Sequence, residues 1–241
     1  MRSALDGRCD GLRTLGIDTH VGAQRDGHVG AEARVREALL AVAGCASTPK
    51  PTSADLDREA LAVIKASFRD QGIAKVDRIN QDLGQSACSS DKPPSEAVAD
   101  QVMTQARAAV KWPAGGQYFG DWREGEKLAQ NGRGMTWTDT STAPKDNGGS
   151  CYNCHQISKA EISYGTIGPS LYNYGKNRGV SNVAAATAQP IVEYTWMKIY
   201  NGKTYNACSN MPRFGHLGLL DEKQMAHLMS LLLDPKSPVN Q

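Results

Sequence analysis

The chain has 241 residues, of which 40% are hydrophobic and 22% charged, and this composition is ordinary for a globular protein. Its formal net charge is only +2, from 27 basic and 25 acidic residues, whereas nucleic-acid binders concentrate basic side chains far more strongly. No apolar run reaches the roughly eighteen residues that a transmembrane helix needs. Nucleic-acid binding and a membrane-spanning segment are therefore not expected.

The first 44 residues have the character of a leader rather than of a domain. Residues 1–37 are rich in Gly, Arg and Asp and show neither helical nor strand periodicity, which fits a disordered tail or a translation start nearer Val35. The apolar stretch 38–44 resembles the end of a bacterial export signal, and residues 42–45 resemble a lipoprotein cleavage box. We therefore expect 1–44 to be removed and Cys45 to be lipidated in the periplasm. The alternative is a non-lipidated signal that is cut nearby.

Residues 45–111 are expected to form a linker and a helical extension. The segment 46–54 has the Pro, Ser and Thr content of a linker. Apolar residues then recur at helical spacing from Leu56 to Phe68, and a second helix is predicted after Pro93-Pro94-Ser95.

Residues 112–241 have the length of a small all-α domain. We predict helices over 120–131, from Gln189 onward, and from Asp221, where Gln224 occupies the capping-box position. Strand patterns are not evident. Four tryptophans are expected to pack in the core or around a cofactor: Trp112, Trp122, Trp137 and Trp196.

The central motif is Cys151-Tyr152-Asn153-Cys154-His155. Thiols at this spacing can add to the two vinyl groups of haem, and the adjacent histidine then reaches the iron. A thioredoxin-like redox pair and half of a zinc site are the alternatives. The first lacks a βαβ context, and the second lacks a partner CxxC or HxxxH pattern. The motif predicts one covalent haem c.

A second axial ligand is expected downstream of the motif. Met211 lies in a loop that Pro212 and Gly215 keep out of helix, a position that suits a thioether ligand. His216 is the minor alternative. The remaining candidates lie in predicted helices, where core packing or solvent exposure is expected: Met197, Met225, His227 and Met229.

The order of these features resembles class I cytochrome c. The matching features are a helix, CxxCH, the segment Gly168-Pro169-Ser170-Leu171, a Met-Pro loop and a terminal helix. The resemblance implies that the Pro169 carbonyl accepts a hydrogen bond from His155 and so orients this ligand.

A narrower resemblance is to SoxX, the mono-haem subunit of the SoxAX complex. It covers about residues 75–235 and rests most strongly on 205–216, with further likeness in 120–127, 132–137 and 147–155. It implies a heterodimer in which SoxA joins thiosulfate to a cysteine of the carrier SoxYZ. This chain would relay the released electrons to a soluble acceptor within an L-cysteine S-thiosulfotransferase, so no catalytic residue is expected here.

Two other functions are compatible with the motif. One is a free-standing electron shuttle to a terminal oxidase, which would need neither the extension nor a long Met loop. The other is an enzyme that uses Cys208 as a reactive thiol. Five basic residues are either a docking ring for an acidic partner or solvated charge: Lys176, Arg178, Lys198, Lys203 and Arg213.

Two cysteines remain after the others are assigned. With the haem cysteines and Cys45 allotted, and Cys9 placed in the leader, Cys88 and Cys208 are left in an oxidising compartment. We predict a disulfide between them, which would tie the extension to the Met211 loop.

Overall fold

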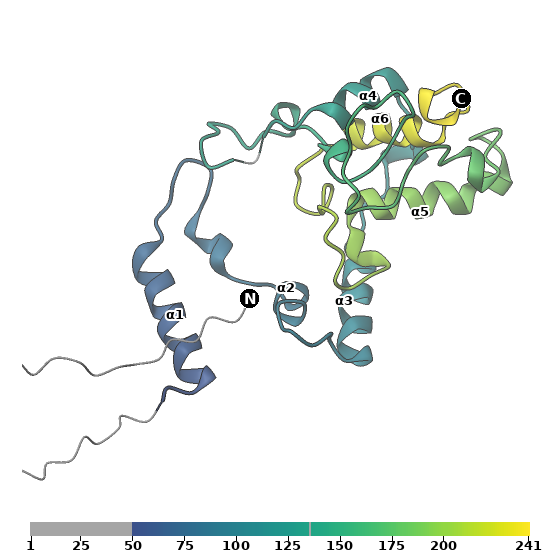
Figure 1. Ribbon diagram of the computed structural model, residues 1–241. Coiled ribbons are helices and arrows are strands. Elements are labelled where there is room, and N and C mark those ends of the chain that lie inside the picture. Colours follow the sequence, from purple (N-terminus) through teal and green to yellow (C-terminus); the bar gives the residue numbers. More distant parts are fainter. Residues whose placement is uncertain (1–49, 135) are drawn as a thin grey trace, which may run out of the picture. The chain divides into compact units, whose positions relative to one another are not determined.

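The computed structural model describes residues 50–134 and 136–241 (Figure 1). The predicted leader, Cys9 and Cys45 lie outside these residues. The chain divides into two compact units, 1–58 and 59–241. Within the described residues there is no β-strand, only an isolated bridge between Gln71 and Ala74, so the all-α prediction is confirmed.

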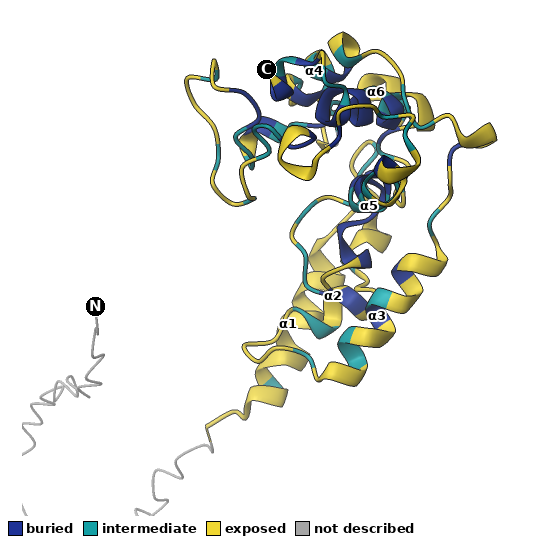
Figure 2. Cartoon of the chain, turned by 90° about the vertical axis from the view of Figure 1, so that its right-hand side faces the viewer, coloured by how far each residue is buried: buried dark blue, intermediate teal, exposed yellow. Residues whose placement is uncertain are grey.

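Six α-helices alternate with short 3-10 turns in the described part of the chain. They are α1 (Ser53–Ser67), α2 (Leu83–Ala87), α3 (Glu96–Ala108), α4 (Trp122–Gln130), α5 (Gln189–Tyr200) and α6 (Glu222–Leu233). No residue of α1 is buried (Figure 2). None of the helices in the described residues is both long enough and apolar enough to cross a membrane.

The predicted helices begin at the polar residues that the sequence places before them. The Ser95 side chain accepts a hydrogen bond from Val98 N at the start of α3. Asp221 and Gln224 form the expected capping box at the start of α6, in which each side chain accepts from the other residue's backbone N–H. These caps satisfy backbone donors that a helix start leaves free.

Helices α4 and α6 lie side by side (Figure 1). A Cβ on Gly125 of α4 would lie 2.2 Å from the carbonyl oxygen of His227 in α6, so only glycine permits this approach. His227 Nδ1 accepts a hydrogen bond from Asp121 N at 2.8 Å and thereby also caps the start of α4. The contact fixes the start of α4 against α6.

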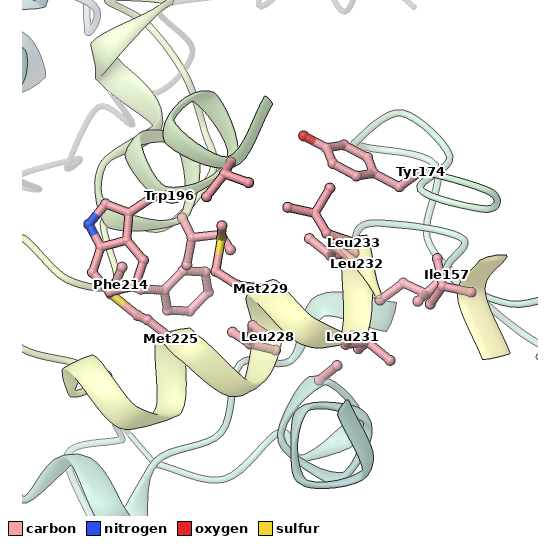
Figure 3. Packing of buried hydrophobic residues seen from close by; sticks show 14 of the residues in the cluster. Ile157, Tyr174, Trp196, Phe214, Met225, Leu228, Met229, Leu231, Leu232 and Leu233 are labelled. Atoms are coloured by element: carbon pink, nitrogen blue, oxygen red, sulfur yellow. The ribbon is translucent and has the colours of Figure 1, made fainter. Parts of the chain in front are cut away.

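The hydrophobic core extends from the contact between α4 and α6 to α5 and the segment around Phe214. Trp196 of α5 and Phe214 face Met225 and Met229 of α6 (Figure 3), and all four are buried. Trp196 is 2% exposed, and its indole N–H donates to Lys111 O at 2.9 Å. This packing confirms that Met225 and Met229 are core residues.

Two of the four tryptophans do not pack in the hydrophobic core, and the alternative expectation for them, packing around a cofactor, stays a prediction. Trp112 is 47% exposed and Trp137 is 62% exposed. Trp112 keeps an edge-on contact with Tyr118, which in turn packs edge-on against Trp196. Trp112 therefore contacts Tyr118, and it is Tyr118 that packs against the core residue Trp196.

Candidate haem-binding site

The CxxCH motif folds as one tight turn. Residues Cys151–Asn153 form a 3-10 turn, preceded by Ser150 in the left-handed region at φ 50°. Cys151 O accepts from both Cys154 N at 3.1 Å and His155 N at 2.9 Å. The two cysteines and the histidine of the motif therefore belong to a single compact loop.

This loop is tied to the end of α4 by backbone hydrogen bonds. Gly149 N donates to Leu128 O at 2.9 Å, and Ser150 N donates to Asn131 O at 3.0 Å. On its other side, Gly168 N donates to Cys154 O at 2.8 Å. The motif is thus held both by α4 and by the Gly-Pro segment that follows it.

The His155 ring is held by Pro169. Its Nδ1 lies 2.6 Å from the Pro169 carbonyl oxygen, as the resemblance to class I cytochrome c implied. A carbonyl can only accept, so Nδ1 carries the proton and Nε2 keeps a free lone pair. That is the tautomer that a metal ligand needs.

Gly168 allows the ring to take this position. A Cβ at residue 168 would lie 2.2 Å from Cε1 of His155 and 2.7 Å from Nε2. Any larger residue would push the imidazole away, so the Gly-Pro pair both makes room for the ring and orients it.

The two motif cysteines are not joined in a disulfide. Burial raises the pKa of the Cys151 thiol to about 12. A thioredoxin-like pair needs the opposite shift, because its attacking cysteine acts as a thiolate at neutral pH. The local environment therefore disfavours the redox-pair interpretation.

The zinc interpretation gains no further ligands from the fold. Across residues 50–134 and 136–241, His, Cys, Asp and Glu side chains form no group of three or more that could hold a metal ion. A structural zinc site requires four such ligands. The donor set around the motif, two thiols and one oriented imidazole, instead fits covalent haem.

Met211 lies on a separate loop between α5 and α6. It is partly buried and packs against the same hydrophobic core as Cys151 and Leu171. Its backbone N donates to Ser209 Oγ at 3.3 Å. Cys151, Cys154, His155 and Pro169 form one hydrogen-bonded unit, and Met211 shares with that unit the apolar core.

The other candidates for the second iron ligand are Met197, His227 and His216, and their surroundings differ from that of Met211. The Met197 sulfur lies 3.8 Å from the hydroxyl of Tyr205, which donates to it. His227 packs at the start of α4, as described above, and His216 is exposed. Burial lowers the pKa of His216, and the charge of Arg213 adds to this effect.

Cys88 and Cys208 form a disulfide in the structure, with their Cα atoms 5.5 Å apart. Cys88 is the C-terminal cap residue of α2, and Cys208 precedes Met211 by three residues. The predicted link between the extension and the Met loop is therefore present. Cys208 has no free thiol, which removes the reactive-thiol interpretation.

An ionic cluster beside the Met loop was not foreseen. Arg213 forms an ion pair with Asp82 at 2.6 Å, and Lys203 Nζ donates to Ala207 O at 2.8 Å. Lys203 is 9% exposed, so the prediction of a docking ring or solvated charge is wrong for this residue. Asp82 and Arg213 lie far apart in the sequence, so no local sequence pattern could predict this ion pair.

The other proposed docking residues are less buried. Lys176 and Arg178 are exposed, and the Arg178 guanidinium lies 3.7 Å from the centre of the Tyr174 ring. Lys198 is partly buried and lies 5.4 Å from the centre of the Tyr205 ring. Both contacts are cation–π interactions.

Comparison with known proteins gives one informative relative. No protein-family model matches the chain. It is 32% identical over 214 residues to a protein of Aquifex aeolicus (strain VF5) described as "Uncharacterized lipoprotein", a match that covers 86% of this chain and 88% of that protein. The chain therefore belongs to the same family as this Aquifex aeolicus protein.

Proposed function

We propose that the chain is a c-type cytochrome with one haem bound through thioethers to Cys151 and Cys154. His155 and Met211 would hold its iron. The observation that carries this proposal is the hydrogen bond between His155 Nδ1 and Pro169 O, because it leaves Nε2 free on the same loop as two cysteines that form no disulfide. Haem, when bound, supplies a one-electron redox couple.

The residues of the chain set the conditions for that couple. Pro169 holds the Nδ1 proton and makes His155 a more basic ligand. Met211 would offer a neutral thioether, which raises the reduction potential relative to a second histidine. The apolar core that both ligand segments touch limits the access of water.

The arrangement of helices supports a class I cytochrome c fold for residues 112–241. In this proposal α4 and α6 are the first and last helices of that domain, and they meet at Gly125. The CxxCH loop follows α4, and the Met loop precedes α6.

The specific role that we propose is that of SoxX. In a SoxAX complex, the partner SoxA would join the outer sulfur of thiosulfate to a cysteine of SoxYZ and release two electrons. This chain would accept these electrons one at a time and pass them to a soluble acceptor, as the relay subunit of an L-cysteine S-thiosulfotransferase. The support is the resemblance over residues 75–235, above all in 205–216.

A reconstitution tests this role. The mature chain should copurify with tagged SoxA, and thiosulfate should be coupled to SoxYZ only when SoxA is present. A chain that never associates with SoxA but reduces a terminal oxidase would instead be a free-standing shuttle. Thiosulfate coupling by the isolated chain would show that the catalytic subunit is misassigned.

We also propose that the mature protein is periplasmic and anchored through lipidated Cys45. The support is the cleavage-box pattern before Cys45 and the description of the Aquifex aeolicus relative as a lipoprotein. Metabolic labelling with palmitate should label the wild-type protein and not the variant Cys45→Ala. Label in both proteins would contradict anchoring at this residue.

A further inference from the structure

A cavity of about 500 Å³ lies beside the Met211 loop. Its wall includes Gln85 of α2 on the side of the extension and Ser209 and Asn210 on the side of the loop. The Cys88–Cys208 disulfide also lines it. The space is therefore built from two segments that the disulfide holds together.

Two cations line this cavity. Lys203 is 9% exposed, and the Arg213 side chain is 15% exposed. None of the described residues that line the cavity is acidic. Asp82 forms an ion pair with Arg213, and its charge also acts on Lys203, so the two cations share one carboxylate.

The hydrogen bonds leave donors available. The ammonium of Lys203 has three N–H groups, and Ala207 O accepts from one of them. The Gln85 carbonyl oxygen accepts from Asp82 N at 2.8 Å, which leaves the amide NH₂ of Gln85 free to donate. Hydroxyl and amide groups of Ser209 and Asn210 also line the space.

Burial makes the charge on Lys203 costly. Desolvation lowers its pKa, and nearby Arg213 lowers it further, although Asp82 acts in the opposite direction. An anion in the cavity would compensate this charge through charge-assisted hydrogen bonds.

We propose that this cavity binds a small doubly charged oxoanion of the size of sulfate, held by Lys203 and Arg213. The amide of Gln85 and the Ser209 hydroxyl supply further hydrogen bonds. This site goes beyond the proposed electron relay, and Met211, the proposed iron ligand, is one of the residues that line it.

The test is calorimetric titration of the purified mature protein with sodium sulfate, against sodium chloride at equal ionic strength. We expect saturable one-to-one binding of sulfate and none of chloride. Gln85→Glu places a carboxylate on the wall, and glutamate is also a natural capping-box residue at this position, so α2 is preserved. It should weaken sulfate binding at least tenfold, whereas the control Gln101→Glu, on the exposed side of α3, should stay within twofold.

A second variant addresses the cation directly. Lys203→Met keeps an unbranched side chain alongside Gly84, one atom shorter than lysine, but removes its charge, and it should also weaken binding at least tenfold. Its control, Lys176→Met, changes the net charge equally at an exposed position outside the cavity. Absence of saturable sulfate binding in the wild type, or wild-type affinity in Gln85→Glu, would overturn the proposal.

Discussion

The imidazole Nδ1 of His155 lies 2.6 Å from the carbonyl oxygen of Pro169, fourteen residues further along the chain. This single contact settles the histidine tautomer, because the carbonyl has no proton to give. It joins the cysteine loop to the Gly-Pro segment and prepares Nε2 as a ligand.

Gly168→Ala should disturb the His155 ring. The added methyl would lie 2.2 Å from Cε1, so the ring must move, and we expect a loss of about 1–3 kcal/mol in the free energy of unfolding. The haem content of the purified variant should fall as well. Urea unfolding and the pyridine haemochrome spectrum measure these two effects. Gly132→Ala is the matched control, because its methyl would meet only Ser150 Oγ, at 3.5 Å.

Met211→Ala should remove the weak near-infrared band that thioether ligation gives in the ferric protein. The reduction potential should fall, because the thioether ligand that raises it is lost. Absorption spectroscopy and a redox titration measure these changes. His216→Ala alters the exposed alternative ligand on the same loop and should keep both properties. An unchanged band in Met211→Ala would eliminate this ligand.

Replacing both Cys88 and Cys208 by serine should destabilise the protein without leaving a free thiol. The bond joins residues 120 positions apart, and on the chain-entropy model its loss costs about 5 kcal/mol. We further expect the near-infrared band to fade on mild heating before global unfolding, because the Met211 loop loses its tie to α2. Denaturant unfolding and a thermal scan of the band provide the measurements. Peptide mapping that finds both wild-type thiols free would refute the bond.

Asp82→Asn should reduce the loss of unfolding free energy that the protein shows as the pH falls below about 5. Burial acts to raise the pKa of Asp82, but the hydrogen bond from Gln85 N and the Arg213 guanidinium together lower it below 3.8. The unfolded chain then binds the proton more tightly, so this contribution to stability is present above about pH 4 and is lost as the pH falls further.

The wild type should therefore lose more stability between about pH 5 and pH 3 than Asp82→Asn does, as judged by urea midpoints. Asparagine keeps a side-chain acceptor for the helix cap, so the difference reports the negative charge of Asp82, which Gln85 N and Arg213 both stabilise. Parallel curves for wild type and Asp82→Asn would contradict the role of the ion pair.

Local signals explain which parts of this fold could be predicted from sequence. The starts of α3 and α6 follow from Ser95 and Asp221, because capping depends on residues within one turn. The short helix α2 was missed, although Asp82 and Gln85 carry the same capping-box spacing that identified α6. The five residues of α2 are too few to show the apolar periodicity by which a helix is predicted.

Contacts between residues that lie far apart in the sequence could not be predicted from such local patterns. The pairing of Asp82 with Arg213 spans 131 residues, and the burial of Lys203 depends on α2 packing over it. The Cys88–Cys208 disulfide could be predicted because counting the cysteines does not depend on how far apart they lie in the sequence. The site chemistry was predictable for a similar reason, since Cys151, Cys154 and His155 are contiguous.

The central claim is covalent haem attachment through Cys151 and Cys154, and mass spectrometry tests it most directly. The chain is produced in a host with a cytochrome c maturation system and analysed under denaturing conditions. The wild type should carry the added mass of one haem, whereas the double variant Cys151→Ser, Cys154→Ser should carry none. A wild-type protein of unmodified mass, or a haem that acidified solvent extracts, would contradict the account.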